Sequence, residues 1–485
     1  MRKRSPKETV DEPSAPHHSP VASSRLLRRR ITVVIVGVGL AAVLCMARSI
    51  HVRRPSQDAP AAGGSAAWDA GEPPVDAAAV LRLPGALPGT VEQLNSEVLA
   101  IARLLVASLP ERPESHAQAA YAHLQLGQER EALRCWQDAL ARDGNFADAH
   151  LGIGVLLEEQ GDNEQAIASY RRAIALNPSL NEAYRELTEV LLRAGKAEEA
   201  LPVAQEGVQR FATVADYHFW LGQVHLELGD FAAARQAHLE AVRLNPESAL
   251  PYFPLARACA RLGKHDEAAR YRDQFAKLKA AELAADGNRN KSYDDLATQK
   301  QRVVKRHVLA GSLHLQFGDL RLAEAHWVRA AAIDPTDVAT RKALVSLYQN
   351  QTRPAAELQY LAELIRLEPE QVEHALRSGR LRIELQAWAQ AEAELNTLVE
   401  RQPQSPDAHL LLAEMYLKTG ATEAAAKHAD QAASLAPSSP GLLLLAAIRD
   451  QGGDRSGALA ALEQAMSLDP ENAALRRMYE QLRTN

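Results

Sequence analysis

Histidine is the residue type whose abundance and spacing in this chain most suggest chemistry. Sixteen histidines are present, and three pairs stand seven residues apart, which would place both rings on one face of a helix: His116/His123, His218/His225 and His307/His314. A metal site needs three or four convergent donors. Five histidines instead occupy the same place of a repeated segment, 34 residues or more apart: His116, His150, His218, His307 and His409. We interpret the histidines as packing residues and predict no metal.

Motifs for covalent or nucleotide chemistry are missing from the sequence. It contains no P-loop, HExxH or GxSxG pattern, and the nearest approach to a glycine-rich loop, GVGLAAV, lies inside an apolar stretch. Cys45, Cys135 and Cys259 form no CxxC pair, which excludes a zinc ribbon and a thioredoxin-like site. We predict no catalytic residue and no cofactor. An enzyme with an unrecognised site is the alternative.

The net charge of -6 conceals an uneven distribution. Residues 1–54 contain eleven Lys or Arg and three Asp or Glu, a net charge of +8, so the other residues together carry -14. A nucleic-acid groove requires clustered positive charge. The acidic body therefore predicts no nucleic-acid partner, and the abundance of alanine and leucine favours helices over sheets.

A 34-residue period runs through most of the chain. In the segment that starts at Ala147, the eighth, fifteenth, twentieth, twenty-fourth, twenty-seventh and thirty-second residues are Gly154, Gly161, Ala166, Tyr170, Ala173 and Pro178. The same residue types recur from Ala215 and from Val304. Ten copies begin at Pro113, Ala147, Asn181, Ala215, Ala249, Val304, Val338, Val372, Pro406 and Ser439. A period of this length indicates a repeat architecture.

Each copy predicts two amphipathic helices, because apolar residues recur at spacings of three and four. The glycine in the middle of the copy, such as Gly161, supplies a helix C-cap with positive φ. Asp162 and Asp230 then serve as N-caps of the second helix. Thr352 and Gln386 stand where the turn glycine is expected, so we expect those two repeats to be distorted.

The pattern resembles the tetratricopeptide repeat family. The resemblance implies an all-α fold, a right-handed α-solenoid of about ten helix pairs, with repeats 1–5 at residues 113–282 and repeats 6–10 at 304–472. Residues 90–112 and 473–485 predict capping helices, the first with a capping box of Thr90 and Gln93. Residues 283–303 are a polar insert that breaks the period, and we interpret it as an elbow.

The resemblance also implies where a ligand binds. In this family the first helix of each repeat lines a concave groove through its second, fifth, sixth, ninth, twelfth and thirteenth residues. Carried over, these places predict a peptide-binding groove in the third to fifth repeats: Arg185, Glu186, Glu189, Arg193, Phe219, Trp220, Gln223, Phe253, Arg257 and Arg261. Aromatic and arginine residues are common interface hot spots. The alternative is that Phe219 or Trp220 packs against the neighbouring repeat.

One stretch is apolar enough to cross a membrane. Residues 31–47 read ITVVIVGVGLAAVLCMA, without a charge, between arginines at 28–30 and Arg48. Together with the next residues they predict a single transmembrane helix over 31–50 that contacts the lipid bilayer. A cleaved signal peptide is the alternative, but the apolar run is longer than usual and no A-x-A site precedes Arg48.

Flanking charge predicts the orientation of this helix. More Lys and Arg precede it than follow it, which places the N-terminus in the cytoplasm and the repeats on the periplasmic or extracytoplasmic side. Residues 1–30 predict a disordered basic cytoplasmic tail. Residues 51–89 are rich in Pro, Ala and Gly and predict a linker.

These features predict a membrane-tethered scaffold that binds protein or peptide ligands in its concave groove, as an assembly factor on the extracytoplasmic side. One alternative is a chaperone-like accessory subunit that presents clients to an enzyme complex, for example in cytochrome maturation. Another is a scaffold that faces the cytoplasm.

Overall fold

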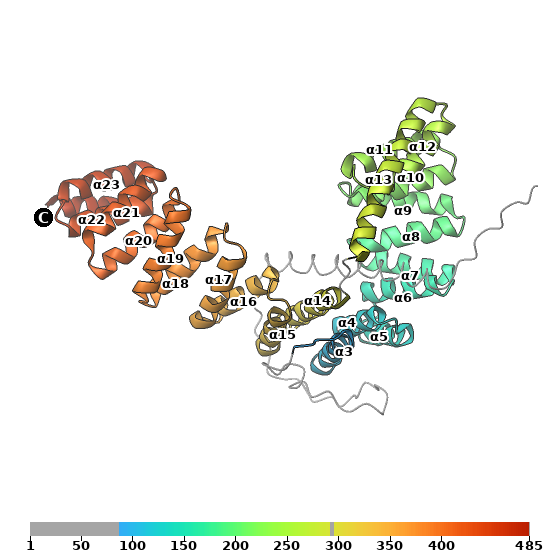
Figure 1. The fold of residues 1–485 in the computed structure, drawn as a ribbon, viewed down its shortest axis with the longest axis horizontal. Helices are drawn as coiled ribbons and strands as arrows, with labels where there is room; N and C mark the ends of the chain where they lie inside the picture. Colours follow the sequence, from blue (N-terminus) through green and yellow to red (C-terminus); the bar gives the residue numbers. More distant parts are fainter. Residues whose placement is uncertain (1–86, 292–294, 485) are drawn as a thin grey trace, which may run out of the picture. The chain divides into compact units, whose positions relative to one another are not determined.

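The computed structural model describes residues 87–291 and 295–484, and its regular elements within these ranges are all helices (Figure 1). The predicted tail and transmembrane helix, and nearly all of the predicted linker, lie outside the described residues. Within the described ranges, no helix is both long and apolar enough to cross a membrane. The chain divides into two compact units, with the boundary between Leu313 and His314.

The first unit contains the five N-terminal repeats. Its helices are α3 (Val91–Ser108), α4 (Pro113–Gln125), α5 (Glu129–Arg142), α6 (Ala147–Glu159), α7 (Asn163–Leu176), α8 (Asn181–Arg193), α9 (Ala197–Arg210), α10 (Ala215–Glu227), α11 (Phe231–Leu244), α12 (Tyr252–Arg261) and α13 (His265–Lys291), with most of α14 (Asp295–Gln316). Helices α13 and α14 therefore include most of the polar insert. Successive helices pack in pairs, each pair being one repeat.

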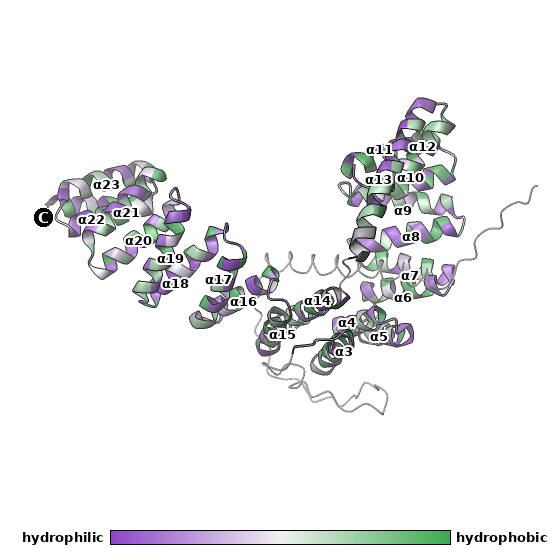
Figure 2. Cartoon of the chain, viewed as in Figure 1, coloured by the Kyte–Doolittle hydropathy of each residue, from purple (hydrophilic) through white to green (hydrophobic). Residues whose placement is uncertain are grey.

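The second unit repeats the same design. Its helices are α15 (Leu320–Ile333), α16 (Val338–Asn350), α17 (Pro354–Leu367), α18 (Val372–Glu384), α19 (Trp388–Arg401), α20 (Pro406–Thr419), α21 (Thr422–Leu435), α22 (Ser439–Gln451), α23 (Arg455–Leu468) and α24 (Ala473–Thr484). Hydrophobic and hydrophilic residues alternate along the helices of both units (Figure 2). One face of each helix is thus available for packing against its neighbours.

The turn between the two helices of a repeat is built as the sequence predicts. Gly161 has a φ of 83°, and the Asp162 carboxylate accepts a hydrogen bond from the Gln165 amide at 3.2 Å. Asp230 caps the next such helix in the same way, through the Ala233 amide at 3.0 Å. These two N-cap predictions are confirmed.

The repeats that contain Thr352 and Gln386 do not show the expected distortion: the turn and the lengths of the helices are regular. Both residues adopt the left-handed conformation, with φ of 52° and 58°. The helices on either side have 13 and 14 residues, as in the regular repeats. Packing of the helix pair therefore imposes the turn even where a residue other than glycine must adopt it.

Small and large residues interlock inside each pair. A Cβ atom added at Gly154 would lie 2.6 Å from the ring of Tyr170, and one added at Gly222 would lie 2.5 Å from the ring of His238. Tyr170 and His238 are both fully buried. Glycine at the eighth place of these two copies thus leaves room for the ring at the twenty-fourth place.

The recurrent histidines act in packing. His116 donates to the Pro110 carbonyl oxygen at 2.9 Å, and His218 donates to that of Ala212 at 2.9 Å. In each case the acceptor lies six residues upstream, and three further fourth-place residues repeat the contact: His150, Tyr252 and His409. The fourth place therefore supplies a donor that holds the preceding loop against the first helix of the repeat.

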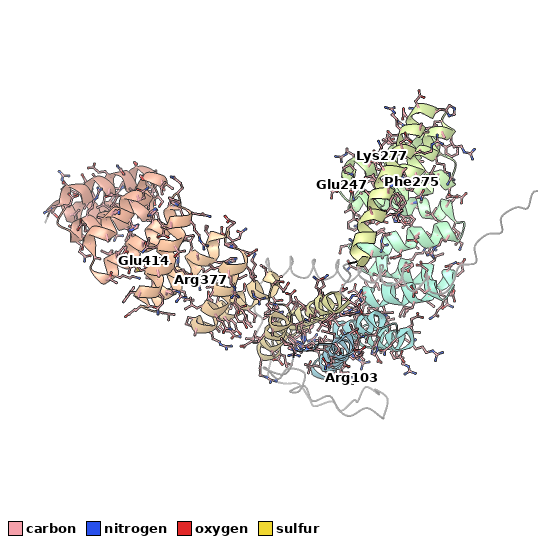
Figure 3. All side chains as sticks on the ribbon, viewed as in Figure 1. Arg103, Glu247, Phe275, Lys277, Arg377 and Glu414 are labelled. Atoms are coloured by element: carbon pink, nitrogen blue, oxygen red, sulfur yellow. The ribbon has the colours of Figure 1, made fainter. Side chains whose placement is uncertain are left out.

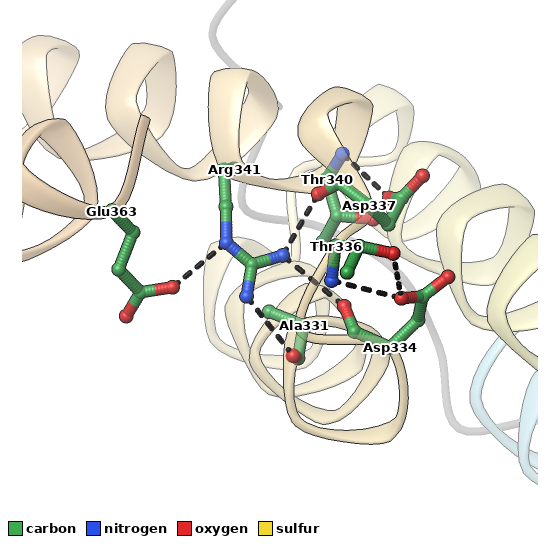
Figure 4. A network of polar contacts seen from close by, with 7 residues as sticks. All are labelled: Ala331, Asp334, Thr336, Asp337, Thr340, Arg341 and Glu363. Carbon is green, nitrogen blue, oxygen red and sulfur yellow. Dashed lines mark hydrogen bonds and ion pairs between the residues drawn. The ribbon is translucent and has the colours of Figure 1, made fainter. Parts of the chain in front are cut away.

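Arg341 takes this role in the second unit (Figure 4). Its side chain is 3% exposed and pairs with Glu363 at 2.7 Å. The guanidinium also donates to the carbonyl oxygens of Asp337 at 2.8 Å, Asp334 at 3.2 Å and Ala331 at 3.3 Å. The buried charge is satisfied by one carboxylate and the loop between α15 and α16, so it joins two repeats.

Candidate functional site

The first helices of the third to fifth repeats, α8, α10 and α12, carry the predicted site residues, and all three lie in the first unit. In every repeat, we call the corresponding side of the first helix the helix-A face. α12 begins at Tyr252, because the prolines at 251 and 254 delay its first turn, and it has ten residues where α8 and α10 have thirteen.

The arginines of the third repeat are held in ion pairs. Arg193 pairs with Glu158 of α6, whose side chain is 3% exposed and also accepts a hydrogen bond from Tyr170 at 2.7 Å. Arg185 pairs with the buried Glu186 at 2.5 Å. These pairs join or brace the repeats, so Arg185 and Arg193 are less available to a ligand than the sequence suggested. Glu189 is half-buried beside them on α8.

The aromatic residues of the fourth repeat are half-buried. The rings of Phe219 and Trp220 are 5.2 Å apart in an edge-to-face arrangement, and Phe219 lies 5.7 Å from the ring of His238 on α11. Phe219 therefore packs within its own repeat, against the second helix. Trp220 and Gln223 retain part of their surface on α10.

The fifth repeat has the most exposed site residues. Phe253 is 54% exposed, although large apolar side chains usually bury more of their surface. Arg257 lies 3.7 Å from Glu227, and both side chains are more than half exposed. The Arg261 guanidinium stands 5.6 Å from the centre of the Phe231 ring, and no carboxylate of the residues that the structure describes forms an ion pair with it.

One aromatic residue of this region was missed from the sequence. Phe275 on α13 lies 5.5 Å from Phe253, ring centre to ring centre, and Figure 3 shows it on α13 close to Lys277. The signal was present: Phe275 occupies the twenty-seventh place of the repeat that starts at Ala249, where six of the other nine copies have alanine. The structure thus brings Phe253, Phe275, Arg257 and Arg261 to the end of the first five repeats.

This arrangement of rings and arginines can bind a ligand. Apolar rings beside arginines can contact an apolar side chain and pair with a carboxylate. Among the residues that the structure describes, no group of three or more His, Cys, Asp or Glu could hold a metal. Burial raises the pKa of the Cys135 thiol to about 12, which leaves it protonated and unreactive at neutral pH.

Comparison with known proteins identifies the repeats. The family described as "Tetratricopeptide repeat" matches residues 118–181, 186–249 and 376–440. These three stretches are tetratricopeptide repeats. Tetratricopeptide repeat protein 7B of Homo sapiens is 28% identical over 180 residues, which cover 34% of this chain and only 21% of the human protein. Proteins of the tetratricopeptide repeat family mediate protein–protein interaction and are generally non-enzymatic scaffolds.

Solved structures similar to parts of this chain include MamA and YrrB. MamA, residues 41 to the end, from Desulfovibrio magneticus RS-1 is 22% identical, with a TM-score of 0.33, over 35% of this chain and 96% of that one. YrrB, described as a tetratricopeptide repeat protein with an unusual peptide-binding site, is 17% identical, with a TM-score of 0.33, over 38% of this chain and 95% of its own.

Proposed function

We propose that this tetratricopeptide repeat protein is a scaffold whose helix-A face in the fourth and fifth repeats binds a peptide segment with apolar and acidic side chains. The observation that carries the proposal is the exposed Phe253 beside Arg257 and Arg261. An aromatic anchor next to arginines that lack a tight internal partner favours such a ligand. Arg185 and Arg193, which are held in ion pairs, contribute to the rigidity of the helix-A face.

The charge of this surface selects the class of ligand. Arg257 is 51% exposed and its Glu227 contact is long, so a ligand carboxylate can replace Glu227 without leaving a buried charge unpaired. A basic peptide would meet Arg257 and Arg261 as like charges. The helices are already formed before the ligand binds. Binding therefore restricts the conformational freedom of the ligand much more than that of the scaffold.

A pair of model peptides tests this proposal. The probes are fluorescein-labelled dodecapeptides of alternating Glu and Leu, or of alternating Lys and Leu, titrated against the full chain by fluorescence anisotropy. Arg243 provides a matched control, because it is an arginine of α11, 67% exposed and paired with Glu240 at 2.6 Å. Arg235 is a poor control, since it pairs with Glu267 at 2.6 Å and holds α11 against α13.

The acidic peptide should bind more tightly than the basic one. Combined Arg257→Glu and Arg261→Glu substitutions should weaken its binding by about tenfold or more, equivalent to about 1.4 kcal/mol, and Arg243→Glu should not. Phe253→Ala should weaken binding and leave the helix content unchanged. Equal binding of the two peptides, or equal losses in the double variant and in Arg243→Glu, would show that this face is not the site.

We further propose that the scaffold is tethered by a transmembrane helix over residues 31–50 and acts as an assembly factor on the extracytoplasmic side. The uncharged run at 31–47 and the excess of basic residues before it support this proposal. Protease added to intact spheroplasts should digest a C-terminal tag without lysis. Protection of the tag until lysis would place the repeats in the cytoplasm instead.

A further inference from the structure

Helix α14 packs against the start of the first unit, far away in the sequence. Arg306 of α14 donates to the side-chain oxygens of Gln118 at 3.2 Å and Gln125 at 3.3 Å, both on α4. Its guanidinium carbon lies 5.9 Å from the centre of the Tyr121 ring. The next residue, His307, is fully buried and contacts Glu97 of α3 at 2.9 Å. These contacts span 181 to 210 residues of sequence.

The surface that α14 covers corresponds, by its places in the repeat, to the predicted ligand-binding surface of the later repeats. Gln118, Tyr121 and Gln125 are the sixth, ninth and thirteenth residues of the first repeat. The same places in later repeats hold the residues from which a groove is predicted. The helix-A face of the first repeat is therefore already occupied, and its occupant is a helix of the same chain.

The occupant presents a recognisable pattern. Val303, Arg306, His307 and Ala310 recur at spacings of three and four and are all buried, whereas the neighbouring Lys305 is exposed. This spacing is one face of an amphipathic helix. Carboxylates recur along the same register: Glu114, Asp148 and Glu182 take the second place of three successive repeats, and Asp148 and Glu182 act electrostatically on Tyr121. Burial and the nearby Glu114 raise the pKa of Asp148 to about 6.

The contact is incompletely satisfied. Arg306 is 4% exposed, yet the acceptors that it contacts are neutral amide oxygens and an aromatic ring. Four buried polar atoms of α4 and Arg306 have no hydrogen-bond partner in the structure: Glu114 Oε2, Tyr121 Oη, Gln125 Nε2 and Arg306 Nη2. Each of these atoms costs free energy while α14 is docked, and the cost is recovered when water reaches it. A docked state of this kind favours exchange of the occupant.

We propose that α3 and the helix-A faces of repeats 1–3 form a docking site for an amphipathic helix that inserts an arginine beside Tyr121. α14 fills the first-repeat part of this site within the chain, and a partner that carries such a helix displaces it. The partner's basic residues extend along the carboxylates of the second and third repeats, Asp148 and Glu182, neither of which forms an ion pair with Arg306. This site is separate from the face of the fourth and fifth repeats, so either proposal can fail alone.

The experiment uses the full chain and a fluorescein-labelled peptide of residues 295–313 as the partner probe. The wild-type chain should bind this peptide weakly, because the internal α14 competes at a high effective concentration. Arg306→Ala loosens the internal helix and should raise the affinity for the wild-type peptide at least tenfold. Lys305→Ala is the matched control, because it removes the adjacent but exposed cation, and it should change nothing.

Two further measurements separate docking from a general loss of structure. Tyr121→Ala in the Arg306→Ala background should abolish peptide binding, and a peptide with Arg306→Ala should not bind either chain. Hydrogen exchange of the amides at 303–310 should quicken in Arg306→Ala, while the amides of α10 and α11 keep their protection.

Three results would overturn the proposal. The peptide could bind the Arg306→Ala chain no better than the wild type, or its binding could survive the loss of the Tyr121 ring. A wild-type dimer in sedimentation that Arg306→Ala dissociates would assign α14 to a second copy of the chain, and the site would then serve self-association and not partner exchange.

Discussion

Replacement of Thr352 by glycine should stabilise the second unit. Thr352 has a φ of 52° at an exposed turn, and its hydroxyl contacts the Gln351 carbonyl oxygen at 2.7 Å. An L-residue in the left-handed region costs about 1–2 kcal/mol. Glycine removes that cost but loses about 0.5–1 kcal/mol more in conformational entropy. The expected net gain for Thr352→Gly is therefore about 0.5–1 kcal/mol.

The reverse substitution at an equivalent turn provides the control. Gly420 has a φ of 82°, and a Cβ atom added there would meet nothing within 4 Å. Gly420→Ala should therefore cost about 1 kcal/mol through backbone conformation alone. Thr352→Ala keeps a Cβ atom and removes the hydroxyl, so it should not stabilise the protein.

Hydrogen exchange is the suitable assay, because repeat arrays unfold locally as well as globally. Amides in the cores of α16 and α17 should exchange about two- to fivefold more slowly in Thr352→Gly than in the wild type. Urea unfolding of the full chain should show a matching rise in midpoint. If Gly420→Ala is destabilising while Thr352→Gly has no effect or is harmful, the strain assigned to Thr352 does not exist.

Two other expectations concern buried groups in the first unit. Burial lowers the pKa of His238 from 6.5 to about 4, so the unfolded chain binds the proton more readily and the stability present above pH 6.5 is lost as the pH falls toward 4. Between pH 7 and 4.5, the free energy of unfolding measured in urea should therefore fall by about 2–3 kcal/mol less in His238→Asn than in the wild type. The same pH dependence in both proteins would contradict this expectation. Arg193→Met should cost about 2–4 kcal/mol, since it strips the counter-ion from Glu158, whose side chain is 3% exposed. Glu158→Gln should lower the stability by only about 1 kcal/mol, because Arg193 is 45% exposed and stays hydrated. Equal losses of stability in the two variants, measured by thermal unfolding, would refute this difference.

Local features of the repeats could be predicted because they depend on few neighbouring residues. The turn glycine and the aspartate after it interact within one turn of helix, as Gly161 and Asp162 do. The recurrence of histidine at the fourth place likewise indicated packing, and the acceptor proved to be a carbonyl oxygen only six residues away. Contacts at such short range follow from register alone.

The sequence predicted the side of the helices on which the candidate site lies, but not which of its residues are exposed or paired. Register placed Arg193 and Arg257 on the same side of the first helices of the third and fifth repeats. It could not show that Arg193 is paired with the buried Glu158, whereas Arg257 makes only a long contact with the exposed Glu227. That difference depends on which carboxylate a neighbouring repeat brings near. Phe275 illustrates the same limit, since its departure from alanine was visible but its contact with Phe253 was not.

The sequence by itself determined the repeating helix pair, because a 34-residue period of small residues, rings and turn glycines has one packing solution for each copy. The resemblance to tetratricopeptide repeats, together with register, also predicted which side of each first helix faces a ligand. Only the tertiary structure decided that α14 returns to α3 and α4 and covers the first repeat. Arg306 and Gln118 are 188 residues apart, and a contact at that distance depends on the accumulated geometry of every repeat between them, which no local pattern encodes.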